Sequence, residues 1–549
     1  MDLEKKIKTI ALKNAVKYDG EANKGSVVSA LLGDHPELKQ DMAEITSDID
    51  NVLDEVNSLS LDEQEALLKE VEPSFFEEDE EKSIFARYDI EGDVKTAFPP
   101  APEKYPHIGH AYALFINYQL AKENDGEFII RFEDTNPAKV EQKYYSGMIE
   151  DFEWLGIEWD DVTYASDFMD VFMEKAEEGI QKGFLYMCNC SGDAISDMRE
   201  SGEGCACKQN DVEKNQNLWE EFKEGDLPEY SLRIDIGMDH ENSAMRDPVL
   251  FRHVGKSHCR HGKKYQVWPT YDFQNSILDG EQEITHRFRS KEFEMRDELH
   301  TYIQEKYGYE PTTIFEFARF EMEDTVTSGR VIREKIQNDE FDGWDDPRLT
   351  TLKGLRRRGF QPEAIKEFLL GRGISKTEST VTWNDLIVEN RRYLDDKADR
   401  LYMIQNPLEI DVDGLNEPCR LDSHPDRDDA SRQLTIADTL LIEEDDYESL
   451  EEGKLYRLKG YCNVIYEGDT LVFDSTDLEK YKEEGEKALH FLPPEDTVEA
   501  SLLMDDGSER DILVEKNVDM IEEGEVIQFE RFGFARLDSE NPLYFVFTH

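Results

Sequence analysis

The sequence predicts a multidomain protein centred on an α/β, doubly wound, Rossmann-like parallel sheet, with a helical N-terminal extension, a helical connecting region and C-terminal β-barrels. Three observations support this fold class. The chain has 549 residues, which is too long for one ordinary domain. A strand–loop–helix–strand pattern occupies residues 94–132, and this is how a doubly wound fold begins. After about residue 406, short strands and turn residues alternate at a density typical of barrels.

The N-terminal extension, residues 1–85, is expected to be helical. Its apolar residues repeat at helical spacing within Ile45–Val56. A second helix is predicted at Leu61–Glu70, where Ser60 can serve as the N-cap and a glutamate follows three residues later. The acidic run Glu77–Glu81 indicates a solvated linker to the next domain.

The α/β domain is expected in two halves, residues 93–184 and residues 263–340. Val94–Phe98 is predicted to be a strand that runs into a Pro-rich turn. An amphipathic helix is predicted at Ala111–Glu123 and a second strand at Phe128–Phe132. Ligands of doubly wound folds bind at the carboxyl ends of the strands, so the residues that follow each strand are candidates for a site.

The remaining elements follow in chain order. Residues 185–262 are expected to form an insertion with a strand at Tyr230–Ile236, and a late strand of the α/β domain is expected at Thr285–Arg289. Residues 341–402 are expected to be helical, and residues 403–549 to form β-barrels. The clearest barrel strands are predicted at Leu455–Tyr461, Thr470–Asp474, Thr497–Met504, Val526–Phe529 and Leu543–Phe547.

The charge of the chain is strongly acidic. It carries 125 Asp and Glu against 63 Lys and Arg, a net charge of −62. One interpretation is an acidic protein that repels nucleic acid; the other is a protein adapted to molar salt, whose carboxylates keep its surface hydrated. The acidic residues are spread over every region, which favours salt adaptation, as in a halophile. At about 1 M salt the Debye length is only about 3 Å, so the net charge does not exclude an RNA partner.

The sequence gives no indication of a membrane protein. No stretch approaches the roughly 18 to 20 apolar residues that a spanning helix needs, and the charged N-terminus lacks the apolar core of a signal peptide. We therefore expect a cytoplasmic protein without a membrane partner. Hydrophobic residues make up 38% of the chain, enough for packed cores, so a disordered protein is excluded.

The sharpest chemical motif is His107-Ile108-Gly109-His110, between the Pro-rich turn and the predicted helix. The N-terminus of a helix offers free N–H groups and a positive dipole end to an anion such as a phosphate. His107 and His110 can add N–H donors, and Gly109 leaves room for a base against the backbone. The alternative is two ordinary histidines near a turn; the strand–turn–helix context favours nucleotide binding.

Four cysteines form two C-x-C pairs, Cys188 with Cys190 and Cys205 with Cys207. Four thiolates are a complete tetrahedral set for a structural zinc ion. Four reduced thiols remain the alternative, because C-x₂-C is the commoner zinc knuckle. A second group, His253, His258, Cys259 and His261, also looks metal-like, but we interpret it as an ordinary loop.

A basic run, Arg356, Arg357 and Arg358, lies in the predicted helical region. These arginines are candidates for contacts with phosphates of a nucleic acid. The alternative is a solvated helix face.

Several segments together resemble class I aminoacyl-tRNA synthetases of the glutamyl/glutaminyl subgroup, in its archaeal-type branch. The first carries the His107–His110 tetrad, and matching segments run from about residue 25 to the C-terminus. They are Thr96–His110 (TAFPPAPEKYPHIGH), Arg131–Pro137 (RFEDTNP), Trp268–Asp279 (WPTYDFQNSILD), Ile284–Glu292 (ITHRFRSKE), Gly343–Arg348 (GWDDPR), Gly354–Gly359 (GLRRRG) and Gln528–Asp538 (QFERFGFARLD).

The resemblance implies a role for each matching residue. Pro100, His107, Gly109 and His110 would hold ATP, and Ser328 and Arg330 would act in the KMSKS-type loop. Glu133 would meet the α-amino group of the amino acid, while Tyr271 and Asn275 would line its pocket. Arg289 would pair with a glutamate carboxylate, a task that suits a planar bidentate donor. Structural ion pairs for Glu133 and Arg289, and a core position for Tyr271, are the alternatives.

Two positions depart from the family pattern. The family usually has an arginine that contacts the amino acid where this chain has Ala97; Lys95 and Lys104 are nearby cations that could compensate. The KMSKS-type loop is degraded to Val326–Val331 (VTSGRV), and family members carry a lysine on or near Val331. Arg330 could supply the positive charge that stabilises the leaving pyrophosphate; the alternative is that this loop has lost its role.

The resemblance implies ATP-dependent activation of L-glutamate and transfer to the 3′ ribose of tRNA(Glu), with tRNA(Gln) as a second candidate acceptor. Mg²⁺ would accompany ATP, and zinc would hold the insertion that grips the acceptor stem. The barrels would read the anticodon, and the chain is expected to act as a monomer. Two alternatives stay open: a glutaminyl enzyme or substrate-shifted paralogue, suggested by Ala97, and an inactive RNA-binding protein, suggested by the degraded loop.

Overall fold

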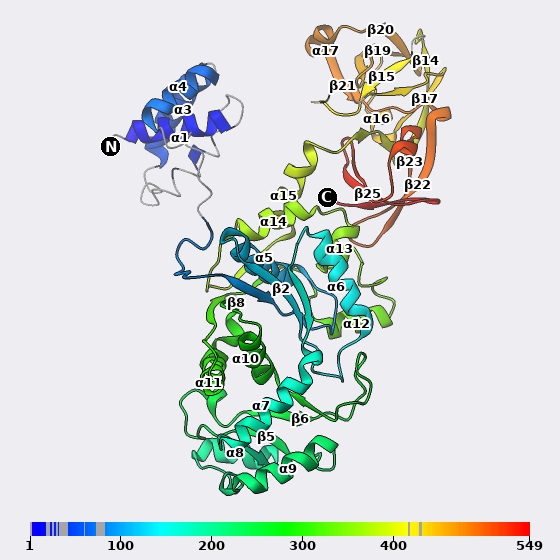
Figure 1. Cartoon of the computed structure of the whole chain (residues 1–549). Coiled ribbons are helices and arrows are strands. Elements are labelled where there is room, and N and C mark those ends of the chain that lie inside the picture. The colour runs from blue at the N-terminus through cyan, green and yellow to red at the C-terminus, as the bar shows by residue number, and fades with distance from the viewer. Residues whose placement is uncertain are drawn as a thin grey trace. The chain divides into compact units, whose positions relative to one another are not determined.

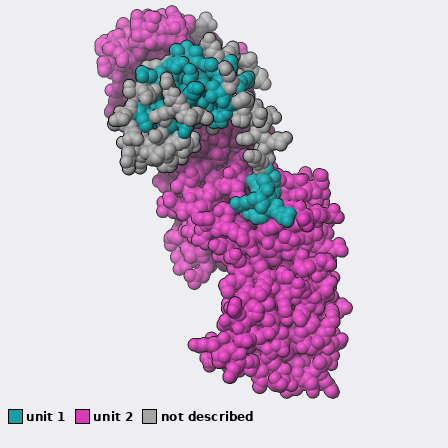
Figure 2. Space-filling model, turned by 90° about the vertical axis from the view of Figure 1, so that its left-hand side faces the viewer, with its two compact units in different colours: residues 1–89 teal, residues 90–549 magenta. Residues whose placement is uncertain are grey.

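The computed structural model describes residues 3–17, 22, 24, 27–28, 31, 42–59, 61–72, 83–415, 418–425, 427 and 431–549. The chain divides into two compact units, residues 1–89 and residues 90–549 (Figure 2). Among the described helices, none is both long and apolar enough to cross a membrane.

The first unit is helical, as the apolar spacing predicts. Its helices are α1 (Leu3–Lys17), α3 (Met42–Asn57) and α4 (Leu61–Val71). Ile49, Val52 and Val56 of α3 are buried in one core with Leu12 and Leu68 of the neighbouring helices. The predicted cap Ser60 and the acidic run at 77–81 lie outside the described residues.

The second unit begins with the predicted parallel sheet, and the fold class is confirmed. β1, β2 and β3 pair in that order, all parallel. β8 pairs in parallel with β9, and Thr285 N donates to Lys95 O at 3.0 Å, so β8 begins beside β1. In Figure 1, α5 lies against this sheet. The elements are β1 (Lys95–Phe98), α5 (Ile108–Glu123), β2 (Glu127–Phe132), α6 (Gln142–Trp154), β3 (Asp161–Tyr164), α7 (Met169–Gln181), α10 (Tyr271–Glu281), β8 (His286–Ser290), α11 (Asp297–Tyr307) and β9 (Thr313–Phe317).

Helix α5 starts earlier than its amphipathic pattern predicts. The prediction was Ala111, but the helix starts at Ile108 because His107 is its N-cap and forms a capping box with His110. A capping box satisfies N–H groups that have no partner at a helix start, so the helix extends to the cap. The two histidines of the motif therefore belong to the first turn of the helix.

The insertion is an antiparallel sheet in the order β4-β5-β6-β7. Its apolar residues share one core with α7, α10 and α11, so the insertion packs directly on the second half of the α/β domain. Its last strand, β7, leads straight into α10 and lies beyond residue 262, the predicted end of the insertion. The elements are β4 (Leu185–Cys188), α8 (Gly192–Ser201), α9 (Val212–Glu224), β5 (Ser231–Ile234), β6 (Val249–His253) and β7 (Val267–Pro269).

The sequence predicted a helical connecting region, but the structure shows that it also contains a strand. Strand β11 lies within it and pairs in parallel with β10, which precedes the KMSKS-like loop. This pairing fixes the connecting region to the α/β domain. The elements are β10 (Phe320–Met322), α12 (Gly329–Gln337), α13 (Leu352–Arg357), α14 (Pro362–Leu370), β11 (Ser379–Val381) and α15 (Trp383–Asp395).

The C-terminal region forms barrel-like sheets, as predicted, and two of them enclose separate cores. One has the strand order β12-β24-β25-β26-β22-β23-β13 and the other β17-β14-β20-β19-β18-β21. The strands are β12 (Arg400–Leu401), β13 (Met403–Ile404), β14 (Pro407–Asp413), β15 (Cys419–Asp422), β16 (Ser431–Leu434), β17 (Thr439–Glu443), β18 (Leu455–Leu458), β19 (Cys462–Glu467), β20 (Thr470–Ser475), β21 (Gly485–Leu489), β22 (Thr497–Leu503), β23 (Glu509–Glu515), β24 (Val526–Phe529), β25 (Gly533–Glu540) and β26 (Leu543–Phe547), with short helices α16 (Glu444–Glu448) and α17 (Leu478–Glu484).

Candidate active site

The two histidines at the start of α5 are held in one tautomer by the backbone. Gly109 N donates to His107 Nδ1 and His107 N donates to His110 Nδ1, both at 3.1 Å. Each Nδ1 is therefore an acceptor, and the proton of each neutral ring lies on Nε2. Burial lowers the pKa of both rings, reinforced by Lys104 and Arg319 and, at His107, by His110; the pKa of His110 falls to about 3. Near neutral pH both rings are uncharged Nε2–H donors.

The backbone around this tetrad is tied to α13. Ile108 N donates to Thr350 O and Leu352 N donates to Pro106 O, both at 2.9 Å. The histidines thus lie where β1, α5 and α13 meet. The positive end of the helix dipole, together with the Nε2–H groups of the two neutral rings, can bind phosphate oxygens.

Gly109 and Pro100 help to position the neighbouring residues of the site. A Cβ on residue 109 would lie 3.0 Å from the His107 ring, so a side chain there would displace the imidazole. Pro100 is buried, and its carbonyl accepts a hydrogen bond from Glu133 N at 2.9 Å. This bond joins the turn after β1 to the residue that follows β2.

The KMSKS-like loop lies against the tetrad segment. Ser328 is the N-cap of α12 and Arg330 is exposed in its first turn. Lys104 Nζ donates to Thr327 O at 3.4 Å. A Cβ on Gly329 would lie 2.9 Å from Lys104 Cδ, so the glycine makes room for the lysine side chain. A cation from the tetrad segment therefore reaches the degraded loop.

The predicted amino-acid pocket is built on β2, β8 and α10. Asn275 is buried on α10, one turn after Tyr271. Glu133 follows β2, and its Oε1 is buried without a hydrogen-bond partner among the described residues. Burial raises the pKa of Glu133 to about 7, although Arg287 and Arg131 oppose the shift. An acceptor of this kind is suited to a substrate ammonium group.

Arg289 lies on β8 and is 5% exposed. Its guanidinium forms an ion pair with the carboxylate of Asp297. Burial lowers the pKa of Arg289, and Tyr271 opposes that shift. Tyr271 itself stacks on Phe293, with ring centroids 4.9 Å apart. The structure thus gathers Glu133, Tyr271, Asn275 and Arg289 around one end of α10.

A buried ionic cluster behind this pocket was missed by the sequence analysis. Asp279 Oδ1 lies 2.6 Å from Arg131 Nη2 and its Oδ2 lies 2.7 Å from Arg287 Nη1. Asn275 Oδ1 accepts from the same two guanidinium groups, at 3.1 and 2.8 Å. His300 Nε2 lies 3.1 Å from Asp279 Oδ2. The sequence did contain one signal. Arg287 and Arg289 occupy alternate positions of a predicted strand, and arginines that become buried need charged or polar partners.

Ala97, the departure from the family pattern, lies on the same face of the sheet. It pairs in register with Ile129, and Ile129 shares its face with Arg131, two residues along β2. Ala97 is 1% exposed and packs against Ile129 and Ile284. Lys95 does not replace an arginine here, because it lies at the start of β1 and pairs with Glu127 at 2.9 Å. Lys104 lies at the KMSKS-like loop instead.

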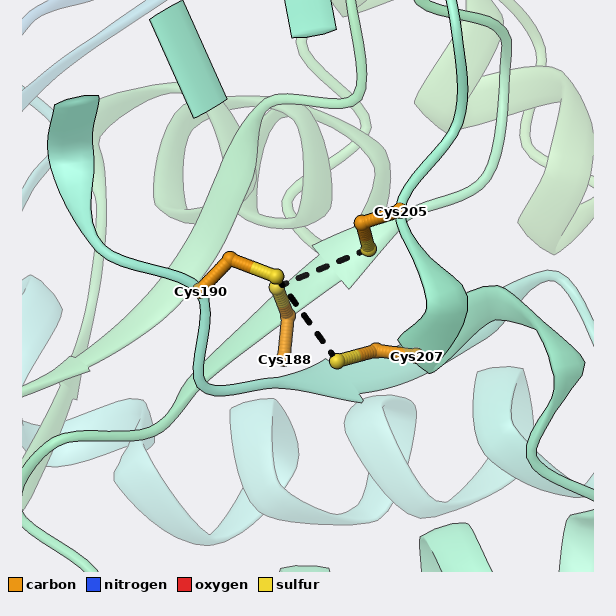
Figure 3. A group of neighbouring side chains, drawn as sticks. All are labelled: Cys188, Cys190, Cys205 and Cys207. Atoms are coloured by element: carbon orange, nitrogen blue, oxygen red, sulfur yellow. Dashed lines mark hydrogen bonds between the residues drawn. The ribbon is translucent and has the colours of Figure 1, made fainter. Parts of the chain in front are cut away.

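The four cysteines of the insertion converge (Figure 3). Cys188 ends β4, Cys205 is the N-cap of the short 3₁₀ turn Ala206–Gln209, and Cys207 lies within that turn. The Sγ atoms of Cys188 and Cys205 are 3.8 Å apart and those of Cys190 and Cys207 are 3.9 Å apart. All four lie within 4.8 Å of one another. A tetrahedral zinc with sulfurs at about 2.3 Å brings them about 3.8 Å apart, so the donor set fits this metal.

The second metal-like group forms a loop contact instead. His258 Nε2 bonds to Asp134 O at 2.8 Å and its ring packs on Trp268. His261 Nε2 bonds to Ser166 Oγ at 3.0 Å. Within the described residues, only the cysteine group has a geometry that could hold a metal ion. The interpretation of this second group as an ordinary loop agrees with the structure.

The structure contradicts the predicted phosphate contacts of the basic run at two of its three arginines. Arg358 is 3% exposed, and its Nε donates to Thr548 O at 3.0 Å. Arg357 Nε pairs with Asp538 at 3.0 Å. Both therefore attach α13 to the C-terminal sheet, because a buried guanidinium needs partners. Arg356 is exposed and remains a candidate for a phosphate contact.

An open groove of about 640 Å³ lies beside Tyr271, between the insertion and the second half of the α/β domain. Three arginines from different elements line it: Arg199, Arg252 and Arg296. Arg296 also pairs with Asp272, which lies in the first turn of α10. A polar groove with guanidinium groups is suited to an anionic chain such as single-stranded nucleic acid.

Comparisons with known proteins match nearly the whole chain. Residues 93–396 match the model for the catalytic domain of class I tRNA synthetases (E and Q). Residues 398–481 and 476–538 match two models for the anticodon-binding domain of the same group. The chain is 35% identical to the glutamate–tRNA ligase of Pyrococcus furiosus over 98% of each chain, and 36% identical to that of Pyrococcus abyssi over 98% of each. It is 34% identical to the glutamate–tRNA ligase of Methanothermobacter thermautotrophicus, again over 98% of each chain.

Proposed function

The chain belongs to the class I tRNA synthetases of the E and Q type, and from this premise we propose that it is a glutamate–tRNA ligase. It activates L-glutamate with ATP to form glutamyl-adenylate, and it transfers the glutamyl group to the 3′-terminal ribose of tRNA(Glu). The observation that carries this proposal is the similarity to archaeal glutamate–tRNA ligases over 98% of both chains, site segments included.

ATP binds at the start of α5 in this proposal. The neutral rings of His107 and His110 donate from Nε2 to phosphate oxygens, at the positive end of the helix dipole. Lys104, with Ser328 and Arg330 of the KMSKS-like loop, faces the pyrophosphate as negative charge develops on it. Bound Mg²⁺ neutralises phosphate charge and orients the leaving group.

Glutamate binds where α10 covers β2 and β8. Glu133 accepts hydrogen bonds from the α-ammonium, and Arg289 pairs with the side-chain carboxylate. The α-carboxylate attacks the α-phosphorus of ATP, and pyrophosphate leaves. A ribose hydroxyl of the tRNA then attacks the carbonyl carbon of the adenylate, and AMP leaves. Positioning and charge stabilisation, which these residues provide, suffice for such a displacement.

The tRNA is held by several parts of one chain, which we take as the active monomer. Its 3′ end follows the groove lined by Arg199, Arg252 and Arg296. The four cysteines would hold a structural zinc ion at the base of the insertion, because two of their S–S distances are 3.8 and 3.9 Å and all four sulfurs lie within 4.8 Å of one another. The C-terminal sheets bind the anticodon, and tRNA(Gln) is the second acceptor to test.

A glutaminyl enzyme is the second candidate, and Ala97 is the observation that favours it. A methyl group in place of a guanidinium removes a positive charge from the pocket side of β1. ATP–pyrophosphate exchange with glutamate and glutamine in parallel, in molar KCl, separates the two candidates. Preference for glutamine overturns the proposal. Exchange with neither amino acid, together with tRNA binding, instead supports an inactive RNA-binding protein.

Aminoacylation of purified tRNA(Glu) and tRNA(Gln) with glutamate completes the test. Charging of tRNA(Glu) is the expected result. Charging of tRNA(Gln) with glutamate as well identifies a non-discriminating enzyme. Failure to charge tRNA(Glu), when exchange is active, rejects that tRNA as the substrate.

A further inference from the structure

Strand β8 places two arginines on the pocket face of the sheet. Arg287 and Arg289 are two residues apart, so their side chains leave the same side of the strand. Helix α10 covers that side, because Asn275 and Asp279 both bond to Arg287. Arg287 is only 2% exposed. A guanidinium is buried this completely only where other charges compensate it, so its partners define its role.

One arginine is enough to balance the charge of the Asp279 carboxylate, and Arg131 already does so. Arg131 already contacts both acceptors, Asp279 Oδ1 at 2.6 Å and Asn275 Oδ1 at 3.1 Å. Arg287 adds a second guanidinium to the same carboxylate, with Nη1 at 2.7 Å from Asp279 Oδ2. The cluster of Arg131, Arg287 and Asp279 therefore carries a net charge of about +1, since arginine stays protonated in proteins.

Glu133 balances this surplus charge while the pocket is empty. The electrostatic influence of Arg287 on Glu133 is the largest among its charged neighbours, and the two groups stabilise each other's charged forms. Arg289 is accompanied by Asp297, so that pair adds no net charge.

The two candidate substrates differ only in their side chains, because both carry an α-ammonium and an α-carboxylate. The side chain of glutamate adds a negative charge to the pocket, whereas that of glutamine adds a neutral carboxamide. The positive charge of Arg287 therefore attracts the side chain of glutamate more strongly than that of glutamine.

We propose that Arg287 is a specificity-determining residue, whose buried charge makes the pocket select the side-chain carboxylate of glutamate over the carboxamide of glutamine. The inference rests on the proposed function and assigns its selectivity to a residue outside the predicted set. It also accounts for Ala97: β1 offers only a methyl group on this face, and β8, which begins beside β1, supplies a guanidinium.

The test compares two charge-free variants with a charged one. Arg287→Met removes both the charge and the hydrogen bonds, Arg287→Gln keeps hydrogen-bonding capacity without charge, and Arg287→Lys keeps the charge. ATP–pyrophosphate exchange gives kcat/KM for glutamate and for glutamine in molar KCl. The expected result is a fall of about 10- to 100-fold in the glutamate-to-glutamine ratio for both charge-free variants, and a smaller change for Arg287→Lys.

Arg432→Met is the matched control. Arg432 is also buried and pairs with a buried carboxylate, Glu515, at 2.9 Å, but it lies in the C-terminal sheets. The Arg432→Met variant should unfold at a lower temperature without a change in the glutamate-to-glutamine ratio of kcat/KM. If Arg287→Gln and Arg287→Met reduce activity with both amino acids equally, Arg287 is merely structural and the proposal is overturned. If Arg287→Met does not fold, Arg287→Gln decides. Wild-type protein that fails to activate glutamate rejects the proposed function instead.

Discussion

Asp279→Asn should destabilise the catalytic region far more than removal of a surface charge. Asp279 is 1% exposed and is the carboxylate partner of Arg131 and Arg287. The substitution preserves shape but leaves two buried guanidinium groups facing a neutral amide. Breaking a buried pair in this way costs about 3–5 kcal/mol in the free energy of unfolding. At roughly 2–4 °C per kcal/mol, the midpoint of thermal unfolding should fall by about 6–20 °C.

The pH dependence of this loss has a definite sign. Burial raises the pKa of Asp279, but Arg287 and Arg131 outweigh it and hold that pKa well below its ordinary value of 3.8. A carboxyl group with a lowered folded-state pKa stabilises the fold above its unfolded-state pKa and loses that contribution as the pH falls through the folded-state value. The difference between wild type and Asp279→Asn should therefore stay constant from pH 8 to pH 5 and narrow only below about pH 3.8.

Thermal unfolding of both proteins, followed by circular dichroism at several KCl concentrations, measures the effect. Buried pairs are screened little by salt, so the difference should persist in molar KCl. The control is Glu158→Gln, because Glu158 is 81% exposed and pairs with Lys122 at 3.3 Å; it should cost less than about 1 kcal/mol. Adding Arg287→Met to Asp279→Asn should recover part of the loss by removing one unpaired cation. A loss no larger than that of Glu158→Gln would refute the charge-balance reasoning.

Four further results are expected. His110→Ala should slow glutamyl-adenylate formation at least about tenfold with little change in tRNA binding, since its Nε2–H faces ATP; equal losses would contradict that role. For glutamate, kcat/KM should rise with pH through about 7 and then level off, because burial raises the pKa of Glu133 and only the carboxylate can bind the ammonium; Glu133→Gln should remove this limb. Cys188→Ser should abolish about one equivalent of bound zinc measured by mass spectrometry in the purified protein, whereas a metal-free wild type would reject the site. Aminoacylation should be faster in molar KCl than at 0.1 M, and an optimum at low salt would contradict salt adaptation.

Local sequence patterns were sufficient to predict those helices and strands whose own residues determine their structure. Strand β1, helix α5 and the strands of the C-terminal sheets were predicted within a few residues, although α5 is buried on most sides and is not amphipathic. Boundaries failed where a cap or a distant partner decided them. Helix α5 starts at Ile108 because two histidines cap it, which residue propensity does not predict. Strand β11 exists because β10, far away in sequence, pairs with it.

The residues of the candidate site also fall into two groups, those that local motifs could predict and those that depend on tertiary packing. Glu133, Tyr271, Asn275 and Arg289 could be predicted because each lies in a short segment with family resemblance. The interpretation of Arg358 as a phosphate ligand was wrong because burial against the C-terminal sheet depends on tertiary packing. Arg287 was missed for the same reason. Its partners, Asn275 and Asp279, lie on α10, and only the crossing of α10 over β8 brings the three together.

The degraded KMSKS-like loop illustrates how a lost local charge can be replaced through space. From sequence, Val326–Val331 lacks a lysine, and the loop's role stays in doubt. In the structure, Lys104 approaches from the tetrad segment and donates to Thr327 O. Its side chain passes over Gly329, where any Cβ would crowd it at 2.9 Å. A side chain at 329 would therefore require the flexible side chain of Lys104 to shift. In the proposed reaction, Lys104 adds its positive charge to that of Arg330 at this loop, because electrostatic stabilisation depends on where a charge lies and not on which residue carries it.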